Sequence, residues 1–129
     1  MKRREVFVGT YNAGMGDWKV VLRQGDSAEF HCAPELGSCP VITMGADVTW
    51  VRLVEYTVHE AFELAMAQMQ CRFVPSFSPS NTNDAYLFIM SHQQFAECSA
   101  IVGLFLSNAI PDIVNAYKKW NKKDKKKNR

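Results

Sequence analysis

Residues 49–70 read TWVRLVEYTVHEAFELAMAQMQ, the longest stretch without glycine or proline in the first two thirds of the chain. Apolar side chains recur in it at gaps of three and four residues, which predicts an amphipathic helix of about five turns. Asp47 precedes the stretch and is the expected N-cap, because its carboxylate can accept from the free amides of a first turn. The predicted inward-facing positions are Val51, Val54, Val58, Phe62, Ala65 and Met69.

The segments before this helix have the pattern of short strands. Residues 4–10, 18–23, 28–31 and 41–44 are apolar or alternating, and glycine, proline, asparagine and aspartate separate them. Such spacing predicts three or four strands joined by turns, in an antiparallel meander. The long helix is expected to pack on this sheet.

The segments after this helix predict further helices. Residues 72–84, rich in serine, asparagine and proline, are expected to form a surface loop. Ser91 and Gln94 have the spacing of a capping box for a helix over 92–108, and Pro111 is expected to begin a third helix over 112–120. The inward-facing positions predicted for the helix over 92–108 are Phe95, Cys98, Val102, Phe105 and Leu106.

Length and composition favour one α+β domain over residues 1–117, with a short antiparallel sheet packed against two long helices and a C-terminal helix. The chain has 129 residues, of which 47% are hydrophobic and 22% charged, typical of a globular protein. Residues 118–129 form a basic tail that we expect to be disordered. The four cysteines show no CxxC spacing and are expected to be reduced thiols.

Charge is distributed unevenly along the chain. Residues 118–129 hold eight basic residues and one acid, whereas residues 5–117 hold four bases and twelve acids, a net charge of −8. A lysine-rich tail predicts weak, sequence-independent contact with nucleic acid. The acidic body is compatible with binding to a protein partner.

The 49–70 stretch also carries a cluster of ionisable residues. On a helix that turns by about 100° per residue, His59, Glu60 and Glu63 lie on one flank. His59 and Glu63 are one turn apart and can reach one divalent cation, while Glu60 can take a proton from a water held by that ion. Glutamates one turn apart are also common on solvated helix faces.

The order of these features resembles the minimal zincin architecture of small phage- and bacterium-encoded metallopeptidase-like proteins. In that pattern a short sheet precedes a helix with an HExxH motif, and a later helix supplies a third ligand. Here HEAFE, residues 59–63, stands at the motif position, with Glu63 in place of the second histidine. The resemblance implies that His59, Glu63 and Glu97 are the metal ligands and Glu60 the general base, with His92 as an alternative third ligand. A set richer in carboxylates still binds Zn²⁺ but favours harder ions such as Mn²⁺ or Mg²⁺.

Two functions therefore remain open from the sequence. The first is a small phage- or prophage-type metal-dependent hydrolase, peptidase-like in mechanism. The alternative is a catalytically inactive zincin-like fold that inhibits or modulates a host bacterial protein. No GxSxG, P-loop or GxGxxG motif occurs, and no signal-peptide pattern is present, so we expect a cytoplasmic protein without membrane contact.

Overall fold

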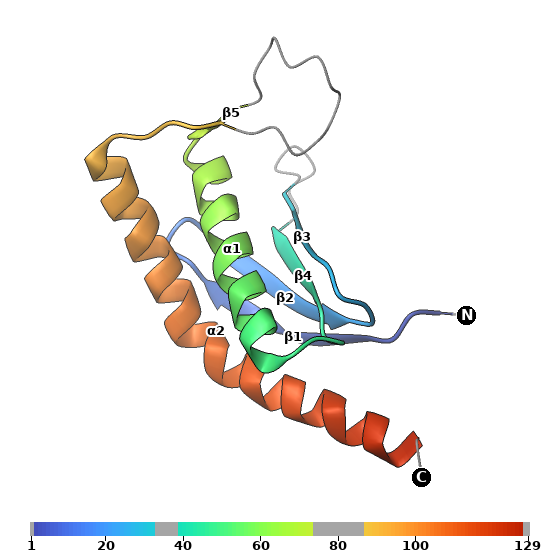
Figure 1. Ribbon diagram of the computed structural model, residues 1–129. Helices are drawn as coiled ribbons and strands as arrows, with labels where there is room; N and C mark the ends of the chain where they lie inside the picture. The colour runs from blue at the N-terminus through green and yellow to red at the C-terminus, as the bar shows by residue number, and fades with distance from the viewer. Residues whose placement is uncertain (1, 33–38, 74–86, 128–129) are drawn as a thin grey trace, which may run out of the picture.

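The computed structural model describes residues 2–32, 39–73 and 87–127, and within them the chain is mixed α+β, as predicted (Figure 1). The predicted loop over 72–84 lies almost entirely outside the described residues. The elements are β1 (Glu5–Asn12), β2 (Asp17–Arg23), β3 (Ala28–His31), β4 (Val41–Gly45), α1 (Trp50–Gln68), β5 (Arg72–Phe73), β6 (Leu87–Phe88) and α2 (His92–Lys127).

The first four strands form one sheet in the order β1-β2-β4-β3, and β5 and β6 form a separate antiparallel pair. The predicted meander is wrong at one place, because β4 pairs with β2 in parallel and with β3 antiparallel. The side chains explain this order. Ile42 and Met44 of β4 are fully buried, as a central strand requires, whereas Glu29 and His31 of β3 are exposed, which suits an edge strand.

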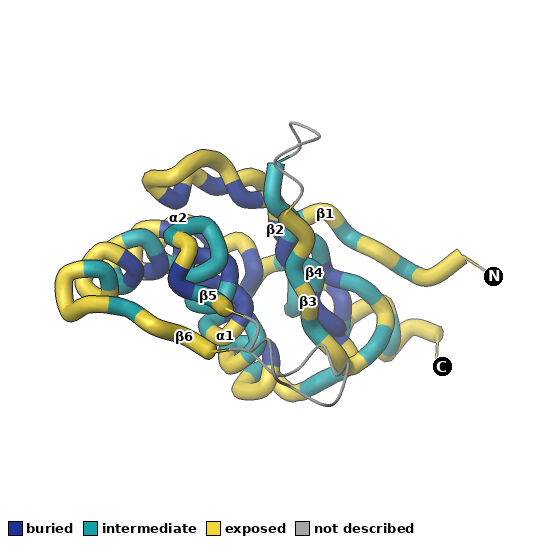
Figure 2. The backbone as a smooth tube through the Cα atoms, turned by 90° about the horizontal axis from the view of Figure 1, so that it is seen from above, coloured by how far each residue is buried: buried dark blue, intermediate teal, exposed yellow. Residues whose placement is uncertain are grey.

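One face of this sheet is packed against the helices. Burial alternates along β2, where Trp18, Val20 and Leu22 are fully buried and the residues between them are not. Helix α1 packs over β3 and β4, and α2 packs over β1 and against α1. The core therefore lies between the sheet and the two helices, as the buried positions in Figure 2 show.

Helix α1 is rotated about its axis relative to the prediction. Its buried residues are Leu53, Thr57, Glu60, Ala61, Leu64 and Ala65. Of the predicted stripe only Ala65 is buried, and Val51 is 76% exposed. The buried face lies roughly a quarter to a third of a turn away from the predicted stripe. The small side chains of Thr57 and Ala61 let the helix approach its neighbours closely, and the rotation places Glu60 on the buried face.

Helix α2 is continuous over 36 residues, so the predicted helix boundary at Pro111 is wrong. Proline inside a helix lacks one backbone donor and bends the helix axis, and Figure 1 shows α2 changing direction near its middle. Helix α2 also continues through residues 121–127, so the expectation of a disordered tail is wrong for this part. Residues 128 and 129 lie outside the described residues.

The C-terminal part of α2 is anchored to the body of the protein by Trp120, which is 2% exposed. The guanidinium of Arg4 lies 3.7 Å from the centre of the Trp120 ring, donates to the Trp120 carbonyl, and pairs with Asp124 at 2.8 Å. These contacts join the residues just before β1 to the end of α2. No local sequence pattern indicates these contacts, because 116 residues separate Arg4 from Trp120.

By length and composition alone, α2 is long and apolar enough to cross a membrane. Its most apolar 18-residue window has a mean hydropathy of 1.4, and 28% of that window is buried. The buried positions Cys98, Val102, Phe105 and Ala109 belong to the core shared with the sheet, and core helices of globular proteins meet the same criterion. The expectation of no membrane contact stays a prediction.

Candidate metal centre

Helix α1 begins one residue later than its expected first position, and its cap differs from the prediction. Thr49 is the N-cap, and its hydroxyl accepts from the Arg52 amide at 3.3 Å. Asp47 accepts instead from the Gly25 amide at 2.8 Å and from the Trp120 indole at 3.0 Å. The start of α1 is thereby fixed relative to the sheet and to α2, and with it the position of the ionisable cluster two to three turns further on.

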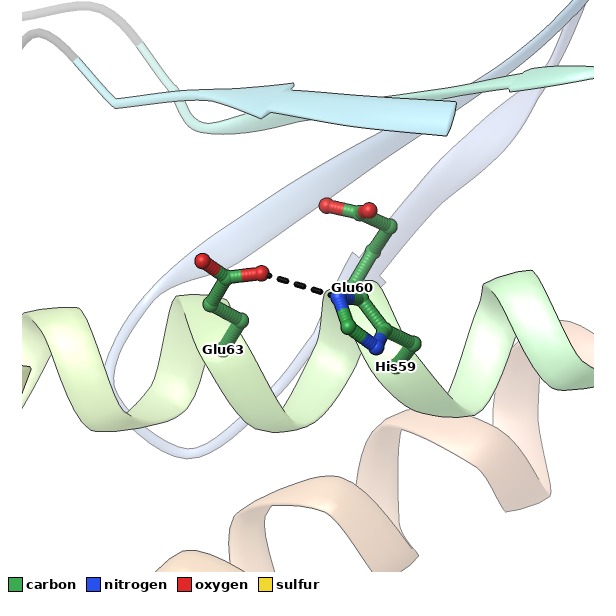
Figure 3. A group of neighbouring side chains, drawn as sticks. All are labelled: His59, Glu60 and Glu63. Carbon is green, nitrogen blue, oxygen red and sulfur yellow. Dashed lines mark ion pairs between the residues drawn. The ribbon is translucent and has the colours of Figure 1, made fainter. Parts of the chain in front are cut away.

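His59, Glu60 and Glu63 converge on one site. One ligand atom from each side chain lies within 4.8 Å of the corresponding atoms of the other two. The imidazole Nε2 of His59 lies 3.1 Å from Oε2 of Glu63, one turn along α1, as the dashed line in Figure 3 marks. His59 is 67% exposed and Glu63 is 17% exposed, so the cluster has an open side toward solvent and a buried side toward the sheet.

Glu60 forms the buried side of the cluster, with 7% of its surface exposed. Figure 3 shows its carboxylate directed from α1 toward the strands. Burial, followed by the negative charge of Glu63, raises the pKa of the Glu60 carboxyl, and no hydrogen bond within the described residues offsets this. A carboxyl with a raised pKa beside a second carboxylate is a stronger proton acceptor than an ordinary carboxylate.

Residues of the neighbouring strands surround this cluster. Arg72 of β5 lies 3.9 Å from Glu63, and its guanidinium lies 5.3 Å from the centre of the Phe30 ring of β3. Glu29 of β3 pairs with Arg23 at 2.7 Å, and this hydrogen bond lowers the pKa of the Glu29 carboxyl. The charge of Glu29 in turn contributes to the raised pKa of Glu60. The cluster thus faces an edge strand that carries its own fixed charges.

Glu97 and His92 do not belong to the group that the structure brings together. Among the described residues, the candidate metal-binding group consists of His59, Glu60 and Glu63. Glu97 is exposed on α2 and accepts from the side-chain Nε2 of Gln93 at 3.3 Å. His92 is exposed at the start of the same helix. The inward side of α2 near Glu97 is taken by the buried Cys98.

Two of the three donors have the spacing that a divalent cation requires. Two ligands of one zinc ion, each about 2.1 Å from it, lie about 3–3.5 Å apart, and the His59–Glu63 separation of 3.1 Å agrees with this. One imidazole nitrogen and one carboxylate, with solvent in the remaining positions, suit Zn²⁺ or Mn²⁺. A cation would also relieve the repulsion between two carboxylates that lie close together, one of them buried.

Two residues of this site were not found from the sequence. Arg72 and Glu29 lie on short strands, and no helical spacing links them to HEAFE. Arg72 is the one basic residue between Arg52 and Lys118, a signal that could have suggested a charge partner for the acidic helix. No family model matches the sequence, and neither a curated protein nor a solved structure matches the chain.

Proposed function

We propose that this protein is a zincin-like metal-dependent hydrolase whose cation is held by His59 and Glu63, with Glu60 as the proton acceptor. The observation that supports it is the convergence of these three side chains, whose ligand atoms lie within 4.8 Å of one another. A divalent cation in this position would polarise a scissile carbonyl and lower the pKa of a water molecule. The proposed substrate class is peptides.

The surroundings of each of the three side chains suit its role in the proposed reaction. His59 is exposed and can turn its Nε2 to an ion that arrives from solvent. Glu63 is held between His59 and Arg72, which limits its rotamers and presents one oxygen to each side. Glu60 lies on the buried side, where its raised pKa favours taking up a proton from the water, and that proton would then pass to the leaving group.

Glu97, the third ligand implied by the zincin resemblance, has no part in this proposal. The two protein ligands leave the remaining coordination positions to solvent and substrate. We therefore expect weaker metal binding than a site with three histidines provides.

Three variants separate the assigned roles. His59→Ala and Glu63→Gln should weaken Zn²⁺ and Mn²⁺ binding, whereas Glu60→Gln should retain binding and lose hydrolysis of fluorescein-labelled casein. Casein hydrolysis by the metal-loaded wild-type protein is the expected positive result. Loss of metal binding in Glu60→Gln would show that Glu60 is a ligand and would contradict its role as proton acceptor.

A second candidate function is an inactive zincin-like fold that binds a host bacterial protein. Large apolar side chains are exposed where β5 and β6 meet the start of α2, which favours a protein contact there. They are Phe73, Leu87, Phe88, Ile89 and Phe95. Pull-down from bacterial lysate would test it. A specific partner retained by Glu60→Gln and lost by Ile89→Asp would support this candidate, and equal retention by both variants would contradict it.

A further inference from the structure

A groove of about 580 Å³ lies between β1 and the C-terminal half of α2, away from the candidate metal centre. Strand β1 contributes the apolar residues 6–8 to it, and the two valines among them are only partly buried against the core. Helix α2 contributes three exposed lysines, Lys119, Lys122 and Lys123. The groove therefore has one apolar wall and one wall that carries positive charge.

The backbone of β1 is open on the side away from β2. Strand β1 stands at the edge of the sheet, and among the described residues no strand pairs with its other side. The Arg4 carbonyl accepts from the Gln24 amide at 2.9 Å. By the alternation of an antiparallel pair, the amides and carbonyls of Glu5 and Phe7 then face away from β2. This edge can therefore accept a further strand.

A strand added to this edge would direct half of its side chains toward α2. Val6 is paired with the fully buried Leu22, so Val6 lies on the face of the sheet that the helices cover. Side chains of a strand alternate between the two faces. Every second side chain of an added strand would thus lie on the same face as Val6, the face toward the lysines of α2.

The groove has an excess of positive charge at one end. Its lining contains four basic residues and one acid, Asp112, which stays negative while it accepts from the neutral Tyr11 hydroxyl at 2.8 Å. Arg4 is paired with Asp124 at 2.8 Å, which leaves the three lysines as the excess. Asp112 precedes Lys119 by seven residues, about 10 Å along the helix. The lysines therefore form a basic end of the groove, and Asp112 lies toward the other end.

We propose that this groove binds an extended, acidic segment of a partner protein, which adds to β1 as a fifth strand and directs its carboxylates toward the three lysines. In strand addition, backbone hydrogen bonds provide affinity and alternate side chains provide specificity. A nucleic acid has the negative charge but no repeating amides and carbonyls for the edge of β1. A second copy of this chain would bring its own lysines to the basic end. The inference is independent of the candidate metal centre.

The basic end can be tested with a matched pair of variants. The probe is a fluorescein-labelled octapeptide of alternating valine and glutamate, titrated by anisotropy. Lys119→Gln/Lys123→Gln should weaken its binding at least about threefold through the loss of two exposed ion pairs. Lys118→Gln/Lys125→Gln removes the same charge from residues of α2 that do not line this groove and should have a much smaller effect. Equal effects of the two double variants would overturn the proposal in favour of diffuse attraction to the helix end.

Strand addition is tested on the peptide, which leaves the protein unchanged. Successive residues of a strand direct their amides to opposite edges, so N-methylation of all valines and N-methylation of all glutamates block opposite edges of the octapeptide. One methylated peptide should bind at least about tenfold more weakly than the other, because it loses its hydrogen bonds to β1. Equal affinities of the two methylated peptides would overturn the proposal. Tighter binding of oligothymidylate than of the unmethylated peptide, at equal charge, would contradict it in favour of nucleic acid.

Discussion

The indole Nε1 of Trp120 donates a hydrogen bond of 3.0 Å to Oδ1 of Asp47, across 73 residues of sequence. The other oxygen of Asp47 accepts from the Gly25 amide at 2.8 Å. One carboxylate therefore connects the turn after β2, the segment before α1 and the C-terminal half of α2. These contacts hold the sheet and both helices in fixed relative positions.

Removal of this carboxylate should destabilise the fold. Asp47→Ala loses two hydrogen bonds to a charged acceptor and leaves the Trp120 donor without its partner, so we expect a loss of about 1–3 kcal/mol in the free energy of unfolding. Urea denaturation followed by tryptophan fluorescence measures it. Asp26→Ala, at an exposed carboxylate in the neighbouring turn, is the control and should change stability by less than about 0.5 kcal/mol.

Trp120 tests whether the end of α2 belongs to the folded protein. The side chain is 2% exposed and lies beneath the Arg4 guanidinium, so Trp120→Ala should cost about 3–5 kcal/mol in the free energy of unfolding. Lys122→Gln, two residues further along α2 and exposed, should have almost no effect. A fully stable Trp120→Ala variant would instead support the disordered tail expected from the sequence.

The buried Glu60 should make stability depend on pH. Its pKa is raised in the folded state, so in the range just above the ordinary carboxyl pKa of about 4.3 the folded protein binds more protons than the unfolded chain. Stability of the metal-free protein should therefore decrease as the pH rises through the folded pKa. Glu60→Gln has no such charge to bury, so it should be more stable than the wild-type protein at neutral pH. Its stability should not show the decrease with rising pH that Glu60 causes.

Thermal unfolding in the presence of EDTA at a series of pH values would check this expectation. Glu55→Gln is a matched control on the same helix, because Glu55 is exposed and paired with Arg52. Parallel stability curves for Glu60→Gln and the wild-type protein would contradict the burial of a charged Glu60.

Local patterns of the sequence predicted much of the fold. Ser91 and Gln94 form the expected reciprocal cap, with Gln94 N to Ser91 Oγ at 3.1 Å and Ser91 N to Gln94 Oε1 at 2.8 Å. The first four strands and α1 lie close to where turn residues and apolar spacing indicated, and α2 begins at the predicted His92. The HEAFE cluster was found in the same way, because His59 and Glu63 are joined by one helical turn.

Long-range packing could not be predicted in this way. The rotation of α1 depends on which side chains fit against the sheet and α2. The small Ala61 is buried there, whereas the larger Val51 is exposed. The continuity of α2 past Pro111 follows from burial of Ile113 and Trp120 in the core, which outweighs the missing donor. The position of β4 depends on its parallel pairing with β2, which no local pattern indicates. Glu97 was assigned from the zincin resemblance, and no helical spacing related it to α1.

The exclusion of Glu97 and His92 from the site gives a direct prediction. Neither residue lies in the group formed by His59, Glu60 and Glu63, so Glu97→Gln and His92→Ala should leave the affinity for Zn²⁺ and Mn²⁺ unchanged. Isothermal titration of the two variants beside the wild-type protein would show it. Weakened binding in Glu97→Gln would restore the ligand set implied by the zincin resemblance.

The most direct measurement is a calorimetric titration of chelator-treated wild-type protein and His59→Ala with Zn²⁺ and with Mn²⁺, with His31→Ala as a second exposed-histidine control. The account predicts one cation bound per wild-type and His31→Ala chain, and at least about tenfold weaker binding by His59→Ala. Equal affinity in all three proteins, or no binding by the wild-type protein, would contradict a metal centre at His59 and Glu63.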